Sequence, residues 1–195
     1  HSDSSAASDV YKRQVIIVTG PIGSGKSTAI EHISNKGYPT LDLDKISNEI
    51  INSKESIKFL DNNFPGVIKN KKLDKASLAD IVFSDNEKLK ILEDYLHPKI
   101  LIEFQQQASK VDGTLFVEVS APKNIHKDFE CLVISTPESV RIERLLDRGM
   151  KLNDIKNRIH TQKNEDWWNS LGHVISNNSH SSLEQEIDKF INEKI

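Results

Sequence analysis

The chain has 195 residues, of which 36% are hydrophobic and 28% charged, and its formal charge is −3, from 26 Lys and Arg against 29 Asp and Glu. This length and composition are typical of one globular domain. The small negative charge excludes a broad basic surface, so we expect no nucleic acid partner. No apolar run is long enough to span a bilayer, so we expect no membrane association.

The single cysteine, Cys131, lies in an apolar, strand-like run. This context favours a buried core residue over a disulfide, and it indicates a reducing compartment. We therefore expect a cytoplasmic protein.

The first fourteen residues, HSDSSAASDVYKRQ, differ from the rest of the chain in composition. They are polar, lack an apolar targeting core and contain no methionine, Met150 being the only methionine of the chain. We therefore interpret residues 1–14 as a non-native lead-in, with a disordered native tail as the alternative. The fold is expected to occupy residues 15–195 as a single domain.

The segment Val15–Thr28, VIIVTGPIGSGKST, carries the clearest functional pattern. Its first five residues are mostly β-branched and predict a buried parallel strand, and Lys26 opens a helix after a glycine-rich turn. The spacing Gly-x-x-x-x-Gly-Lys-Ser, from Gly20 to Ser27, is the Walker A pattern. A chance glycine turn is the alternative, but it explains neither the flanking strand nor the way the helix begins. The segment therefore predicts a nucleoside triphosphate site.

The chemistry of such a loop follows from its residue types. Glycines allow several backbone N–H groups to turn toward phosphate oxygens at the N-terminus of a helix. Lys26 adds a positive charge over the β- and γ-phosphates, and the Ser27 hydroxyl is a ligand for Mg²⁺. The residues predicted to bind the triphosphate are Gly23, Ser24, Gly25, Lys26, Ser27 and Thr28.

Two aspartates end the predicted second strand, which finishes with Asp42-Leu43-Asp44. Alternation along a strand puts Asp42 and Asp44 on the same side. Asp44 could instead cap the helix expected from Lys45. On spacing alone, this structural role and a catalytic role are about equally favoured. Carboxylates at the carboxyl ends of parallel strands face the ligand crevice of an open α/β sheet, so we favour a chemical role for Asp44.

The segment from residue 45 to residue 110 is predicted to be helical, with no strand as long as the first. Turn signals such as Pro65-Gly66 and Asn70 separate its earlier helices. His97-Pro98 is expected to break the last long helical run. So much helix between two strands predicts an inserted subdomain, which in small kinases holds the acceptor. By itself, His97 is more often a structural residue than a ligand.

The second half of the chain predicts three more strands, at Thr114–Val119, Cys131–Ser135 and His173–Ser176. Glu118 stands where a Walker B carboxylate belongs. The helix expected after Pro137 carries Arg144 and Arg148 on one face. Pairing with nearby acidic residues would explain them on a solvated helix. Next to a phosphate loop, however, paired arginines form a lid that stabilises charge on the transferred phosphoryl group.

Together these motifs resemble the dephospho-CoA kinase family, from about Val15 to about Asn177. VTGPIGSGKST is similar to the family's opening, LDLDKIS to its Asp-x-Asp, and RIERLLDR to its lid. The most specific piece is IVFSDNEKLKILEDYLHPKI, and NRIHTQ and VISN resemble the closing signals. The resemblance implies an α/β fold of the P-loop NTP hydrolase type, a three-layer fold with a five-stranded parallel sheet. Its implied parts are a core (15–44 and 111–195), a helical acceptor-binding insert (about 45–110) and a lid (about 144–168).

The implied reaction transfers the γ-phosphate of ATP to the ribose 3′-hydroxyl of dephospho-CoA, which gives CoA and ADP. Mg²⁺ is implied as cofactor, and we expect a monomer or a small homo-oligomer. The residues that the resemblance implies are Asp44 as base with Asp42 in support, Lys26, Arg144 and Arg148 on the phosphates, Ser27 on Mg²⁺, His97 at the acceptor site and Asn177 near the adenine.

The chain departs from the family pattern at three points. After Val119 the family has Pro-Leu-Leu-Phe-Glu, where this chain has Ser-Ala-Pro-Lys at Ser120–Lys123, near the expected acceptor pocket. Gly172-His173 replaces Ala-Asp, and Arg141 replaces the usual lid glutamine. A P-loop kinase of a nucleoside, nucleotide or sugar acid stays open as an alternative, as does a nucleotide-binding module without catalysis. The intact phosphate loop and Asp44 favour an active enzyme.

Overall fold

The computed structural model describes residues 14–122, 127–178 and 180–195. The predicted lead-in lies outside these ranges except for Gln14, whose carbonyl oxygen accepts a hydrogen bond from Leu115 N at 2.9 Å. The described fold thus begins one residue earlier than expected. The chain divides into two compact units, residues 43–110 and residues 14–42 with 111–195, which are described separately below.

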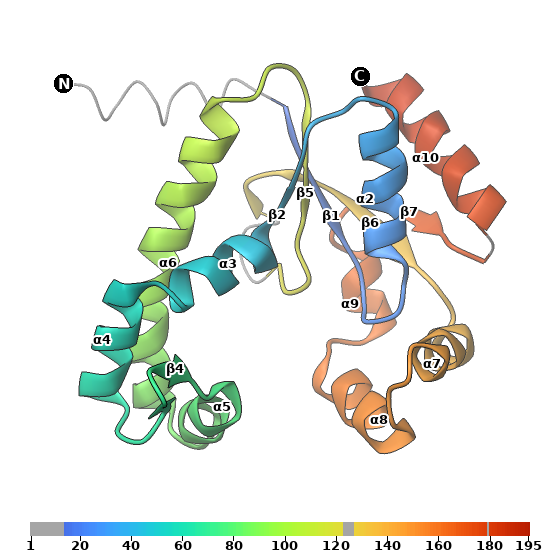
Figure 1. Ribbon diagram of the computed structural model, residues 1–195. Coiled ribbons are helices and arrows are strands. Elements are labelled where there is room, and N and C mark those ends of the chain that lie inside the picture. The colour runs from blue at the N-terminus through green and yellow to red at the C-terminus, as the bar shows by residue number, and fades with distance from the viewer. Residues whose placement is uncertain (1–13, 123–126, 179) are drawn as a thin grey trace. The chain divides into compact units, whose positions relative to one another are not determined.

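The larger unit is built on the predicted five-stranded parallel sheet, with strand order β2-β5-β1-β6-β7 (Figure 1). All five residues of β1 are buried, as its β-branched sequence predicts, because β1 pairs with β5 on one side and β6 on the other. The strand bounds are β1 Val15–Thr19, β2 Thr40–Asp42, β5 Leu115–Glu118, β6 Glu130–Ser135 and β7 His173–Ser176.

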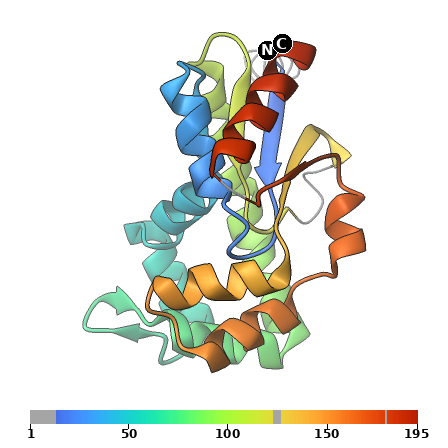
Figure 2. The ribbon, with the colours of Figure 1, turned by 90° about the vertical axis from the view of Figure 1, so that its right-hand side faces the viewer.

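Helices cover both faces of this sheet, which confirms the three-layer α/β architecture. α2 and α10 pack together on one face over a buried apolar cluster that includes Ile33, Phe116 and Phe190. α9 packs against β6, and Figure 2 shows α2 and α9 on opposite sides of β1. The helix bounds in this unit are α2 Lys26–Asn35, α7 Glu138–Asp147, α8 Leu152–Thr161, α9 Glu165–Asn169 and α10 His180–Lys194.

Cys131 lies inside β6 and is 1% exposed, as expected of a core residue. Burial raises the pKa of its thiol to about 11, because the ionised form is poorly solvated there. Its Sγ donates to the carbonyl oxygen of Phe129 at 3.7 Å. The thiol is therefore held protonated inside the sheet.

The smaller unit is mostly helical, as predicted, and has its own apolar core around Leu60, Phe64 and Val67. A short antiparallel hairpin, β3 with β4, was not predicted. Its turn residues Asn70 and Lys71 both have positive φ, 52° and 63°, without the glycine that usually signals such a turn. The bounds are α3 Leu43–Ile51, α4 Lys54–Asn63, β3 Ile68–Lys69, β4 Lys72–Leu73, α5 Lys75–Ser84 and α6 Asn86–Ser109.

The predicted helix break at His97-Pro98 is wrong. Helix α6, Asn86–Ser109, is 24 residues long and continues through Pro98 without a break. A proline removes one backbone N–H donor and strains the preceding turn. Apolar side chains buried on both sides of it, Leu92 and Phe104, supply packing that holds the helix together across this weak point.

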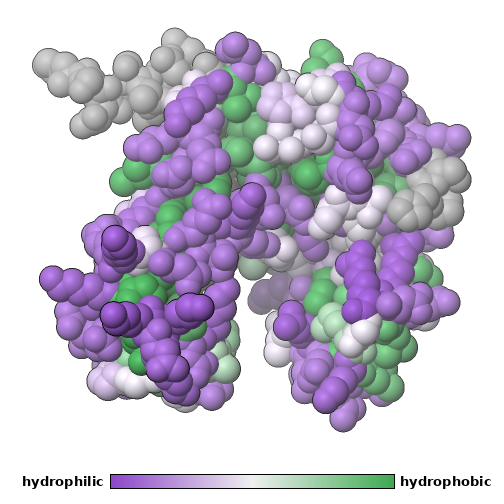
Figure 3. All heavy atoms as spheres, in the orientation of Figure 1, coloured by the Kyte–Doolittle hydropathy of each residue, from purple (hydrophilic) through white to green (hydrophobic). Residues whose placement is uncertain are grey.

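The face shown in Figure 3 is mostly hydrophilic, with hydrophobic side chains in separate patches. Within the described residues, no helix combines the length and the apolar composition that crossing a membrane requires.

Candidate active site

The predicted phosphate loop connects the carboxyl end of β1 to the start of α2 (Figure 1). Gly23 and Gly25 have φ of 79° and 97°, a conformation that other residues rarely adopt. A Cβ atom at Gly25 would overlap Asn177 Nδ2, so this position also needs glycine for space. The loop turns back on itself where Ser24 N donates to Pro21 O at 3.2 Å. The strand, glycine loop and helix predicted from the spacing are therefore confirmed.

Lys26, the first residue of α2, is 9% exposed. Its Nζ donates to Gly20 O at 3.0 Å and to Pro21 O at 3.3 Å. The ammonium group thus lies against the carbonyl oxygens of the loop, at the positive end of α2. This arrangement concentrates positive charge at the loop, where an anion is stabilised.

Ser27 and Glu118 bring a hydroxyl and a carboxylate together beside the loop. Ser27 Oγ donates to Glu118 Oε1 at 2.9 Å, and Glu118 is the last residue of β5, where a Walker B carboxylate was predicted. Asp42 pairs in register with Glu118, so a second carboxylate ends the neighbouring strand. Oxygen donors of this kind are the ligands that Mg²⁺ prefers, so the residues present fit the predicted metal.

Asn177 connects the loop to helix α7 and is 4% exposed. Its Nδ2 donates to Ser24 O at 2.7 Å, while its backbone oxygen and Oδ1 lie 3.2 and 3.4 Å from the donor Arg144 Nη2. Thr136 Oγ1 donates to Ser24 O at 2.9 Å. Buried polar groups are costly when unpaired, so this network fixes the backbone of the loop. Contact between Asn177 and an adenine stays a prediction.

The two predicted lid arginines differ in their surroundings. Arg144 lies beside the loop, and its Nη1 would be 3.8 Å from a Cβ atom at Gly25. Arg148 is exposed and ends α7 as the C-cap residue. Of the remaining predicted loop residues, Ser24 is fully buried and Thr28 is half-buried on α2.

The prediction that Asp42 and Asp44 alternate along one strand is wrong. β2 ends at Asp42 and α3 begins at Leu43, so Asp44 lies in the first turn of a helix. A carboxylate in the first turn of a helix interacts favourably with the helix dipole, so Asp44 favours an early start of α3. Asp44 is exposed, as is His97, which lies midway along α6.

Besides Thr136, two residues that were not assigned to the site form hydrogen bonds with the loop. Arg141 Nη1 donates to Ile22 O at 3.3 Å, and Ile22 N donates to Gln162 Oε1 at 3.0 Å. Burial lowers the pKa of the Arg141 guanidinium, which is 9% exposed and also donates through Nε to Thr136 O at 3.1 Å. The sequence offered one signal for this role: Arg141 lies one helical turn before the buried Leu145, and an arginine on the buried face of a helix needs hydrogen-bond partners.

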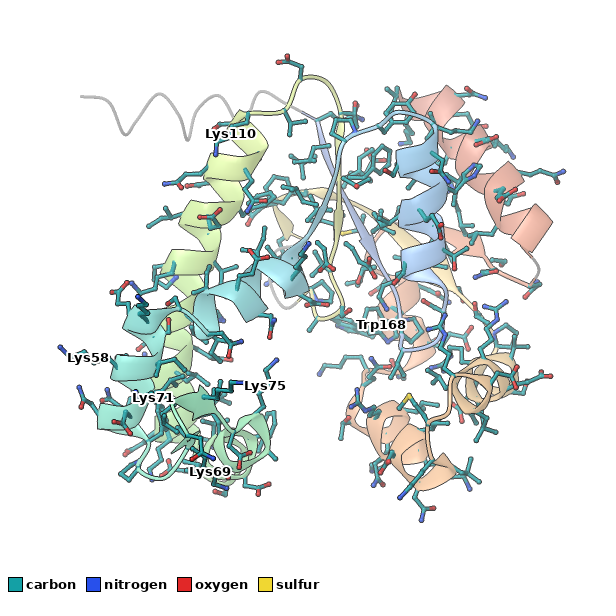
Figure 4. The ribbon with its side chains drawn as sticks, in the orientation of Figure 1. Lys58, Lys69, Lys71, Lys75, Lys110 and Trp168 are labelled. Atoms are coloured by element: carbon teal, nitrogen blue, oxygen red, sulfur yellow. The ribbon has the colours of Figure 1, made fainter. Side chains whose placement is uncertain are left out.

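A cavity of about 710 Å³ lies between helices α7, α8 and α9 and the end of β6. Trp168 of α9, labelled in Figure 4, is part of its wall and is 5% exposed. The indole Nε1 donates to Lys163 O at 3.0 Å. Polar groups on the other walls include Arg141, His160 and Gln162.

Comparison with known proteins identifies the family. The model of the dephospho-CoA kinase family matches residues 14–184. The chain belongs to this family. Dephospho-CoA kinase of Helicobacter pylori is 30% identical over 191 residues, which cover 92% of this chain and 96% of that protein. Dephospho-CoA kinase of Thermus thermophilus is 34% identical over 164 residues, which cover 80% of this chain and 78% of that protein.

Solved structures agree with this assignment. The Thermus thermophilus protein TT1252 has a TM-score of 0.84 at 29% identity, over 94% of this chain and 98% of that one. Dephospho-CoA kinase from Campylobacter jejuni has a TM-score of 0.66 at 31% identity, over 92% and 96% of the two chains. A shikimate kinase from Bacteroides thetaiotaomicron, at 11% identity and a TM-score of 0.53, shares the fold alone, with 92% of this chain and 97% of that one covered.

Proposed function

We propose that the chain is a dephospho-CoA kinase, which transfers the γ-phosphate of ATP to the ribose 3′-hydroxyl of dephospho-CoA and releases CoA and ADP. The observation that carries the proposal is the family match over residues 14–184, a range that contains the phosphate loop, the insert and the lid arginines. We further propose that the enzyme works in the cytoplasm, as a monomer or a small homo-oligomer.

Lys26 and the loop amides bind the β- and γ-phosphates of ATP in this proposal. The support is the pair of hydrogen bonds that holds Nζ against the loop, together with the N-terminus of α2. Because negative charge on the phosphoryl oxygens is redistributed in the transition state, a fixed cation there lowers the barrier. Arg144, held by Asn177 beside Gly25, stabilises the same charge, and Arg148 assists from the end of α7.

Asp44 is the proposed base. The 3′-hydroxyl oxygen forms a bond to the γ-phosphorus while the bond to the β–γ bridging oxygen breaks, so that ADP leaves. The proton of the hydroxyl passes to the Asp44 carboxylate, which orients the nucleophile beforehand. Asp42 supports the acceptor, and His97 contributes to its binding.

Ser27 and Glu118 would hold Mg²⁺, since their oxygens lie 2.9 Å apart and match its ligand preference. When bound, the metal neutralises charge on the phosphate oxygens.

The test is ADP release from MgATP with dephospho-CoA, beside adenosine, AMP, pantetheine and gluconate as acceptors. A Lys26→Ala variant serves as the blank. Turnover with dephospho-CoA alone is the expected result. It would also mean that the chain tolerates its altered Ser120–Lys123 segment, of which Lys123 lies outside the described residues.

Turnover with another acceptor would overturn the substrate assignment and mean that the insert serves a different molecule. ATP binding without turnover of any acceptor would favour a nucleotide-binding module that has lost catalysis.

A further inference from the structure

One residue of the phosphate loop, Ile22, has both of its backbone polar groups hydrogen-bonded to side chains of the α7–α8 segment. Its N–H donates to Gln162 Oε1 at 3.0 Å, and its carbonyl oxygen accepts from Arg141 Nη1 at 3.3 Å. Arg141 belongs to α7, and Gln162 is the C-cap residue of α8. Residues more than a hundred positions further along the chain therefore hold the two peptide groups that meet at Ile22.

Both partners are themselves held in place. Arg141 is 9% exposed and donates through Nε to Thr136 O at 3.1 Å, which fixes its guanidinium at the end of β6. Gln162 leaves α8 with an extended backbone, φ −82° and ψ 163°, while its N–H donates to Ile159 O at 3.1 Å. The side chain is thus attached to a helix end whose backbone is already anchored.

The position of Ile22 gives this contact a consequence for ATP. The next residue, Gly23, has φ of 79°, and a Cβ atom there would lie 3.1 Å from Arg141 Cβ. The Ile22 carbonyl and the Gly23 N–H belong to the same peptide group, so a rotation of the backbone at Ile22 would change the direction of the amides that follow. A loop whose amides are oriented beforehand binds phosphate without the cost of ordering itself.

We propose that Gln162 is a positioning residue for ATP: together with Arg141 on the next peptide group, it fixes the backbone at Ile22 through the Ile22 N–H, so that the loop amides stay directed at the phosphates. The lid helix α8 and the loop are then coupled through one hydrogen bond. The inference rests on the ATP site of the proposed function but not on the identity of the acceptor.

The test compares Gln162→Leu, which removes the acceptor oxygen and ends at the δ carbons, with Gln162→Glu, which keeps an oxygen at the same position. Gln185→Leu, at an exposed position of α10, is the matched control. We expect the Ile22 amide to exchange with solvent at least about tenfold faster in Gln162→Leu, while the buried Val18 amide of β1 is unchanged.

The same variant should bind ATP about 2- to 10-fold more weakly, as expected for one lost hydrogen bond, and kcat should change little. The loop contacts the phosphates before and during the reaction, so the loss should fall on KM. Gln162→Glu should restore slow exchange at Ile22. That rescue is read from exchange rather than from affinity, because the added negative charge acts on ATP directly.

Wild-type exchange and affinity in Gln162→Leu would overturn the inference, as would equally fast exchange in Gln162→Glu, since Gln162→Glu keeps the acceptor oxygen that Gln162→Leu lacks. Failure of wild-type protein to phosphorylate dephospho-CoA would contradict the proposed function but leave the measurements at Ile22 and of ATP binding interpretable.

Discussion

The phosphate loop and the 43–110 insert hold their candidate functional groups in different ways. The loop is surrounded by buried polar partners, because Lys26, Asn177 and Arg141 all donate to loop carbonyl oxygens. In the insert, Asp44 and His97 are exposed on helices whose rigidity comes from an apolar cluster. One region thus fixes backbone atoms through hydrogen bonds, and the other presents side chains on a packed scaffold.

This difference indicates what each region is sensitive to. A polar network fails when one partner is removed, since the other is left buried and unpaired. A scaffold of packed helices tolerates surface changes but not the loss of a large core side chain. The predictions below use that distinction.

The largest effect is expected from Phe64→Ala in the core of the insert, where Phe64 is fully buried. The cavity should destabilise the insert by about 3 to 5 kcal/mol. Hydrogen exchange should accelerate in α4 and α6, while β1 stays protected and ATP still binds. Phe83→Ala is the control, because Phe83 is 80% exposed in the same unit. Equal loss of protection in β1 would mean that the two units unfold together.

Lys26→Ala should lower turnover about 100- to 1000-fold, because the phosphate charge loses a fixed cation. Steady-state ADP release measures the effect. Lys189→Ala removes an exposed lysine of α10 and should leave turnover unchanged. Turnover within tenfold of wild type would contradict the role of the loop lysine.

Asp44→Asn should lower kcat about 100-fold with little change in ATP affinity, because only the base is lost. Glu49→Gln is the matched control on the same helix, also exposed. Kinetics and equilibrium binding of ATP should be measured on both variants. A parallel loss of ATP affinity would make Asp44 a support for the start of α3 instead.

The smallest effect that we expect is on stability at low pH, through Asp74. This residue caps the N-terminus of α5 and accepts a hydrogen bond from Lys69, labelled in Figure 4. The hydrogen bond from Lys69, with those from the Ser77 amide and hydroxyl, lowers the pKa of Asp74 from 3.8 to about 2. A depressed pKa stabilises the fold above about pH 4, and this contribution is lost as the pH falls from about 4 to 2. NMR titration of the carboxyl should show the shift, and Lys69→Met should move the pKa back toward 3.8.

Much of the larger unit could be predicted from local sequence. The strand, loop and helix of Val15–Thr28 depend on neighbouring residues alone, so their spacing was sufficient. Glu118 was found because it ends an apolar run. The identity of the acceptor came only from the resemblance to a family, because the spacing of residues in a motif does not specify a substrate.

The remaining features depend on distant contacts or on conflicts between local signals. Arg141 and Gln162 meet Ile22 across more than a hundred residues, and periodicity carries no information about such pairs. Pro98 signals a helix break, yet tertiary packing overrides it. A turn at Asn70 was predicted, but the Asn70–Lys71 pair has positive φ without the glycine that usually indicates a hairpin, so the two short strands beside it were missed.

The buried thiol of β6 makes the chain a reporter of its own unfolding. Cys131 is the only cysteine, it is 1% exposed, and its pKa is raised to about 11, so a thiol reagent finds almost no thiolate to attack in the folded protein. Unfolding exposes the side chain and returns its reactivity to that of a free cysteine. Labelling rates at neutral pH would therefore follow the opening of the central sheet without any engineered probe, and a bound nucleotide should slow them.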